Sequence, residues 1–153
     1  MDKIEMMINI LKSLFNDPRI KLLMKANECL REKLDLENME LGCVDAMNEI
    51  HRRAFGEKIA DTSSTIQLEQ ALNKNDSFVI VQIPAPGDII LSVTGTGNGN
   101  VAHGHVGVVL TSGYVASNSS LNGRWSKNYT VKNWKERYSN YGGFKLVYYR
   151  KID

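Results

Sequence analysis

The chain has 153 residues, of which 42% are hydrophobic and 24% are charged, and its formal net charge is +2. This size and composition fit a single globular domain with its own hydrophobic core, and they exclude a wholly disordered chain. No apolar run in the sequence approaches the roughly 18 residues that a membrane-spanning helix needs. The net charge is too small to indicate a polyanionic partner.

The first third of the chain predicts two helices, the first over residues 4–15 and the second from Pro18 to about Leu34. Asn16-Asp17-Pro18 separates them, with Asp17 as the cap of the second helix. The polar face of the first helix mixes charge signs instead of being basic, so we expect its apolar face to pack in the core and not on a membrane surface. The apolar stripes are Ile4, Met7, Ile8, Leu11 and Phe15, then Leu23, Ala26, Leu30 and Leu34.

Two more helices and then several strands follow. We expect a helix from near Cys43 to Gly56 and another capped within residues 62–65 and ending at Leu72. Strand-like runs occupy residues 77–81, 89–91, 105–110, 114–117 and 144–149, with turns between them. Helices first and strands later predict an α+β fold in which N-terminal helices pack on an antiparallel sheet. We expect one domain, with residues 1–40 as a helical extension and 41–153 as the functional core.

Basic and aromatic residues gather near the C-terminus. Residues 124–151 hold eight lysines and arginines and one acidic residue, Glu136, and eight aromatic side chains lie between Trp125 and Tyr149. Such a segment either faces a polyanion, such as a cell-wall polymer or nucleic acid, or forms a solvated strand face over an aromatic core. The pattern alone favours the second interpretation. Trp125 and Trp134 are nevertheless candidates for lining a substrate groove.

The two cysteines differ in their expected positions. The first residues of the chain mix acidic with apolar side chains and offer no small-residue cleavage site, so we expect no secretory signal and synthesis in a reducing cytosol without a disulfide. Cys43 opens a helix, where the helix dipole and free amide groups lower a thiol pKa. Taken alone, Cys43 also fits a small buried hydrophobic residue. Cys29 lies inside a predicted helix and is assigned to the core.

The pair His103-Gly104-His105 supplies a second candidate group. His105 begins an alternating strand and could act as a general base, because an imidazole titrates near neutral pH. An H-x-H pair also fits a zinc clip, but the remaining histidine, His51, has no aspartate four residues away, and we expect no metal. A hairpin would bring Asn118 beside the strand of His105, where its amide could orient the ring. A polar turn is the alternative reading of Asn118.

Taken in order, these segments resemble the papain-like cysteine peptidases and amidases of the bacterial cell wall, the NlpC-type and CHAP families. The resemblance covers roughly residues 41–150. Ala116 stands where CHAP members often carry a glutamate, which leaves Ser117 as a competitor to Asn118 for the third catalytic position. The matching segments are Leu41-Gly42-Cys43-Val44-Asp45-Ala46-Met47-Asn48, Pro86-Gly87-Asp88-Ile89-Ile90, Gly104-His105-Val106-Gly107-Val108-Val109 and Ala116-Ser117-Asn118.

The resemblance implies a papain-like peptidoglycan hydrolase with Cys43 as nucleophile, His105 as base and Asn118 as the orienting residue. The enzyme would be an endopeptidase or an N-acetylmuramoyl-L-alanine amidase, with Trp125 and His103 at the substrate. It would act as a monomer, without cofactor, metal or nucleic acid. An endolysin released from the cytoplasm through a bacteriophage holin, and a delivered toxin effector, both fit. Two alternatives remain: a non-catalytic module that binds cell wall or nucleic acid, and a thiol hydrolase or acyltransferase with another substrate.

Overall fold

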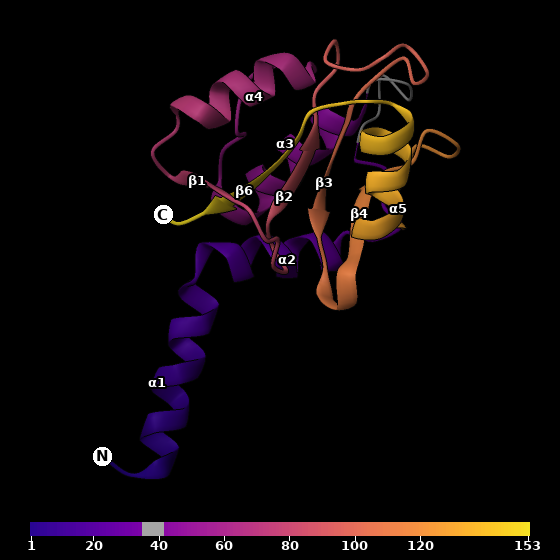
Figure 1. Cartoon of the computed structure of the whole chain (residues 1–153). Coiled ribbons are helices and arrows are strands. Elements are labelled where there is room, and N and C mark those ends of the chain that lie inside the picture. Colours follow the sequence, from indigo (N-terminus) through magenta and orange to yellow (C-terminus); the bar gives the residue numbers. More distant parts are fainter. Residues whose placement is uncertain (35–41) are drawn as a thin grey trace.

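The computed structural model describes residues 1–34 and 42–153 and shows an α+β fold. Its centre is an antiparallel six-stranded sheet in the order β1-β6-β2-β3-β4-β5 (Figure 1). The helical elements are α1 (Lys3–Asn16), α2 (Pro18–Glu28), α3 (Gly42–Phe55), α4 (Thr65–Lys74) and α5 (Val131–Trp134), followed by a π-helical segment η2 (Lys135–Tyr141). The strands are β1 (Phe78–Val81), β2 (Ile89–Ser92), β3 (His105–Val109), β4 (Tyr114–Asn118), β5 (Trp125–Thr130) and β6 (Leu146–Lys151).

The sheet separates two hydrophobic clusters, because successive strand residues point to opposite faces. The larger cluster joins one face of the sheet to α2, α3 and α4, through residues such as Leu22, Met47 and Leu68. The smaller cluster lies on the other face and joins the sheet to α5 and η2 through Trp134 and Tyr138. The predicted α+β class and the packing of N-terminal helices on an antiparallel sheet are therefore confirmed for α2 and α3.

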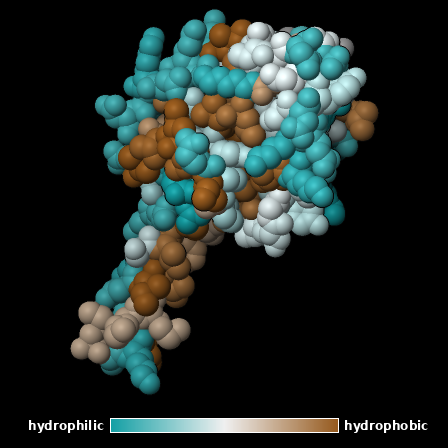
Figure 2. Space-filling view, viewed as in Figure 1, coloured by the Kyte–Doolittle hydropathy of each residue, from teal (hydrophilic) through white to brown (hydrophobic). Residues whose placement is uncertain are grey.

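The prediction that the first helix packs in the core is wrong. The helix itself forms, with Asp2 as its cap, but α1 buries none of its residues. It projects from the body of the protein (Figure 1), and Figure 2 shows hydrophobic side chains along it. Amphipathic spacing predicts a helix correctly but does not show what covers its apolar face. The exposed apolar side chains of α1 are Ile4, Met6, Met7, Ile8, Ile10, Leu11, Leu14 and Phe15.

The second helix begins where it was expected and ends earlier. Asp17 caps α2 by accepting a hydrogen bond from the Arg19 amide. The helix stops at Glu28 and not near Leu34, and Cys29 becomes its C-terminal cap and not an interior residue. After Glu28 the backbone pairs with a distant segment instead of continuing the helix. The Arg31 amide donates to the Trp125 carbonyl at 2.7 Å, and the Trp125 amide donates to the Glu32 carbonyl at 2.8 Å. The predicted boundary between residues 40 and 41, and Leu41 itself, lie outside the described residues.

The Pro86-Gly87-Asp88 turn is fixed by the hydrogen bonds of Asp88 and by the close approach of Gly87 to the backbone of Arg19. Asp88 is fully buried, and its carboxylate accepts two hydrogen bonds from Arg150 of β6 and one from the Ala85 amide. Gly87 has a φ of +96°, in the left-handed region that favours glycine, and a side chain there would collide with the backbone of Arg19. This turn therefore fixes the start of β2 against the C-terminal strand.

None of the helices in the described ranges is long and apolar enough to cross a membrane.

Candidate functional site

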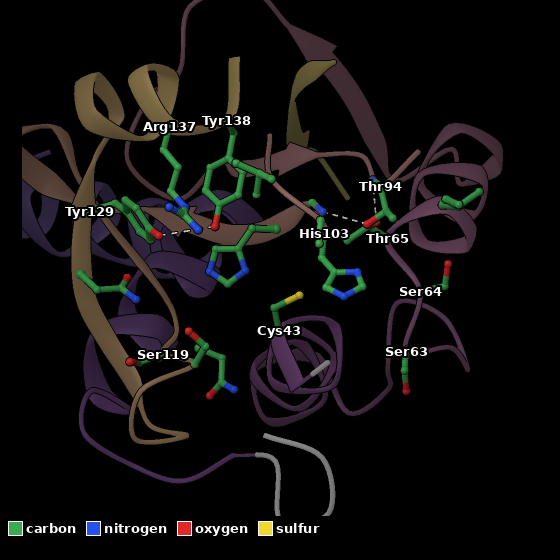
Figure 3. A pocket seen from close by; sticks show the side chains of 18 of the residues that line it. Cys43, Ser63, Ser64, Thr65, Thr94, His103, Ser119, Tyr129, Arg137 and Tyr138 are labelled. Atoms are coloured by element: carbon green, nitrogen blue, oxygen red, sulfur yellow. Dashed lines mark hydrogen bonds between the residues drawn. The ribbon is translucent and has the colours of Figure 1, made fainter. Parts of the chain in front are cut away.

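A cavity of about 820 Å³ lies where α3, β3 and β4 meet the segment before α4 and the η2 segment (Figure 3). Three of the residues that the sequence singled out for catalysis, Cys43, His105 and Asn118, border this cavity, and His103 borders it as well. The other lining residues are mainly hydroxyl-bearing, small or aromatic. The fold thus brings a thiol from a helix start and an imidazole from a strand start to one cavity.

The Cys43 side chain points into the cavity from the first turn of α3 (Figure 3). The backbone amides of Val44 and Val106 donate hydrogen bonds to its sulfur, and both contacts lower the thiol pKa. Val106 follows His105 in β3, so the sulfur lies against the strand that carries the imidazole. Desolvation outweighs these hydrogen bonds and raises the pKa of Cys43 to about 11, because protein surrounds the partly buried thiol. The group is therefore a neutral thiol at pH 7.

His105 is oriented by a chain of two hydrogen bonds. Its Nε2 lies 2.9 Å from Ser117 Oγ, and this hydroxyl donates to Asn128 Oδ1 at 2.7 Å. A serine hydroxyl has one hydrogen, and here Asn128 accepts it. Ser117 must therefore accept a hydrogen bond from Nε2–H, which leaves Nδ1 of His105 unprotonated. This tautomer gives the ring a free lone pair with which to take a proton from another group.

Aromatic side chains surround the His105 ring. It stacks on Trp134 and Tyr138, with ring centroids 5.1 and 5.7 Å apart, and meets Tyr129 edge-on at 6.0 Å. Burial among these rings, and secondarily the positive charge of Arg137, lower the pKa of His105 to about 4. The imidazole is therefore neutral at pH 7. The aromatic C-terminal segment holds the imidazole in place, a role that residue spacing alone did not indicate.

Asn118 does not orient His105, contrary to expectation. The register pairs Gly107 with Ser117, which places Ser117 on the same face of the sheet as His105 and Asn118 on the opposite face. Ser117, the competitor named from the sequence, is the hydrogen-bond partner of the imidazole. Asn118 is nearly fully buried at the cavity wall, and its Oδ1 has no hydrogen-bond partner among the described residues.

Trp125 does not line a substrate groove. Its side chain is fully buried in the larger cluster, and its Nε1 donates to the Ala26 carbonyl at 3.0 Å. Trp134 is fully buried too and donates to Ser92 Oγ. Tryptophan combines a large apolar surface with a single N–H donor, and both requirements are met inside the protein. Of the two substrate-binding candidates, only His103 is exposed at the cavity.

The pair His103-Gly104-His105 has the spacing of a zinc clip, but its surroundings do not complete one. Residues 1–34 and 42–153 contain no group of three or more His, Cys, Asp or Glu side chains placed to hold a metal ion. The glycine between the histidines has a steric role, since a Cβ at Gly104 would collide with the backbone of Ser92, the last residue of β2, and of Thr94 just after it. The close approach of the chain to β2 therefore requires a glycine between the two histidines.

Two residues of the site were not predicted from the sequence. Asn128 completes the hydrogen-bond chain to His105, and Arg137 borders the cavity beside Tyr138. Both belong to the segment after residue 124, whose richness in basic and aromatic residues is the only sequence pattern that points to them.

Comparison of the chain with models of known protein families and with curated protein sequences gives no match.

Proposed function

We propose that this protein is a papain-like cysteine hydrolase that cleaves an amide bond in peptidoglycan. The observation that carries the proposal is that Cys43 and a neutral His105, held by Ser117 and Asn128, border the same cavity. The order of the four cell-wall hydrolase segments in the sequence supports peptidoglycan as the substrate. An endolysin released through a holin, or a delivered effector, is the proposed setting.

The two pKa values favour proton transfer during the attack over a preformed ion pair. Nδ1 of His105 takes the proton from the Cys43 thiol as the sulfur bonds to the amide carbonyl carbon. The protonated imidazole then gives this proton to the departing amine, and a thioester remains. Water, deprotonated by the same imidazole, attacks the thioester, and the released thiolate recovers its proton. Backbone amides in the first turn of α3 stabilise the oxyanion in both steps.

The first test replaces the nucleophile. Cys43→Ala should lower the release of soluble fragments from purified peptidoglycan by at least about 1000-fold, as loss of a covalent nucleophile does. Cys29→Ala is the matched control, because Cys29 is the other free cysteine and lies in the core. Mass analysis of the fragments distinguishes an endopeptidase from an amidase by the new terminus. Lysis by folded Cys43→Ala protein at the parent rate would contradict the proposal.

The second test separates the two histidines at the cavity. His105→Ala should lower activity by roughly 10²–10⁴-fold, the contribution of a positioned general base. His103→Ala should retain most activity, since His103 lies exposed at the cavity and outside the Ser117–Asn128 hydrogen-bond chain. Equal loss in both variants would show that the base has been assigned to the wrong ring.

A second candidate is a non-catalytic cell-wall binding module on the same fold. The raised pKa of Cys43, about 11, favours this candidate, because it keeps the resting thiol neutral. It predicts that wild-type protein and Cys43→Ala sediment equally with purified peptidoglycan, and that neither releases fragments. Fragment release by the wild-type protein alone would exclude it.

A further inference from the structure

The charge distribution around the cavity indicates what the substrate carries. Among the described residues that border it, Arg137 is the only one with a permanent charge, and none is an aspartate or glutamate. The Asp45 carboxylate raises the pKa of Cys43, but it does not border the cavity, and it accepts a hydrogen bond from Ser63 at the wall opposite Arg137 (Figure 3). The η2 side of the cavity is therefore cationic.

Arg137 is held in position by its neighbour. Its guanidinium lies over the Tyr138 ring, with 5.4 Å from Cζ to the ring centroid. Figure 3 shows Arg137 reaching along Tyr138 toward the contact between the Tyr138 and Tyr129 hydroxyls. Within residues 1–34 and 42–153 it joins none of the salt bridges. An exposed arginine of this kind retains donors for a planar anion.

Arg137 also lies close to the reacting groups. Tyr138 stacks on His105, and the charge of Arg137 is strong enough at His105 to contribute to its lowered pKa. A group bound by Arg137 would therefore sit near the amide that Cys43 attacks. The π-helical turn of η2 is what places Arg137 at the cavity next to the buried Tyr138, and such turns recur at functional sites.

We propose that Arg137 binds a free carboxylate of the substrate adjacent to the scissile amide. In peptidoglycan the γ-linked D-glutamyl residue carries such a carboxylate, whereas its amidated form carries a neutral carboxamide. This proposal rests on the proposed function and specifies its substrate. The protein would bind wall peptides that carry the free carboxylate more tightly than their amidated counterparts.

The test measures binding apart from catalysis. The probes are L-alanyl-γ-D-glutamyl-L-lysine and the same tripeptide with D-isoglutamine, titrated by calorimetry into Cys43→Ala protein. We expect the acid to bind more tightly, and Arg137→Gln to weaken it by about 10–100-fold, the cost of a lost hydrogen bond to a charged group. The amide form should bind Arg137→Gln as it binds the parent. Arg137→Lys should keep part of the preference.

The matched control is Lys135→Gln, which removes an exposed cation of η2 that does not border the cavity. It should leave the preference for the acid unchanged. Equal binding of both tripeptides to the Cys43→Ala protein, or equal weakening of both by Arg137→Gln, would overturn the carboxylate site while leaving the hydrolase proposal intact. Selective binding of the acid without any cleavage by the wild-type protein would instead support the site and contradict the hydrolase.

Discussion

At the scale of single residues, the hydrogen-bond chain behind His105 is the feature most open to test. Ser117→Ala removes the acceptor of Nε2–H and frees the ring to change tautomer or rotate. For the proposed hydrolase we expect kcat to fall by roughly 10–100-fold, less than the roughly 10²–10⁴-fold cost of losing the proposed base. Steady-state kinetics over a range of pH would measure this fall.

The comparison variant for this prediction is Asn128→Asp, which keeps an acceptor for the Ser117 hydroxyl. It should retain much of the activity that Ser117→Ala loses. An unchanged kcat and an unchanged pH profile of the proposed reaction in Ser117→Ala protein would show that the aromatic rings alone orient the imidazole.

The pKa of His105 also predicts how stability depends on pH. The pKa is about 4 in the folded protein and 6.5 is its ordinary value, so between these pH values the unfolded chain binds a proton that the folded chain does not. Stability should therefore fall as the pH drops from 6.5 to 4, by roughly 1–3 kcal/mol from this residue. Urea denaturation at pH 7 and pH 4.5 measures the effect.

His105→Phe is the matched variant for this measurement, because phenylalanine keeps a ring in the aromatic cluster and cannot take up a proton. Its loss of stability between pH 7 and pH 4.5 should be smaller than that of the parent. The buried His51, whose pKa is also lowered by desolvation, contributes equally to both proteins. Identical losses in parent and variant would mean that the His105 ring is not the source.

At the scale of elements, the ion pair between Asp88 and Arg150 fixes the start of β2 to β6. Asp88→Ala leaves Arg150 without its partner and the Ala85 amide without its acceptor. We expect the free energy of unfolding to fall by about 3 kcal/mol, as for other broken buried pairs. Arg150→Lys, which keeps the charge but loses the two-pronged geometry, should cost less. A melting temperature for Asp88→Ala equal to that of the parent would contradict this assignment.

The elements also show what local patterns can and cannot predict. Asp17 and Gly56 mark helix ends in the structure as they do in the sequence, because caps act on the neighbouring backbone. Within the cap segment expected at residues 62–65, Ser64 is the cap of α4. The end of α2 was mispredicted, since backbone pairing with Trp125, more than ninety positions away, replaces the last helical turns. Strand β5 was missed for the same reason: its polar sequence is held as a strand by pairing with β4.

At the scale of the whole molecule, α1 is an appendage to the fold. Deleting residues 1–16 should leave the melting temperature unchanged within experimental error, because none of the α1 side chains is buried. Removal of residues 1–26 is the contrasting deletion, since it takes Leu22, Leu23 and Ala26 out of the core and should prevent folding. Thermal denaturation followed by circular dichroism compares the two. A large destabilisation from the shorter deletion would show that α1 packs on the body in solution.

By itself the sequence determined the α+β class, the positions of most elements, and the placement of Cys43 and His105 at a helix start and a strand start. Caps, turn residues and periodicity act over a few residues, so they can be interpreted without the fold. Only the tertiary structure decided that Ser117 and not Asn118 contacts His105, because sheet register sets which of two neighbours shares its face. Likewise, burial of Trp125 and the placement of Arg137 at the cavity depend on segments far apart in the chain.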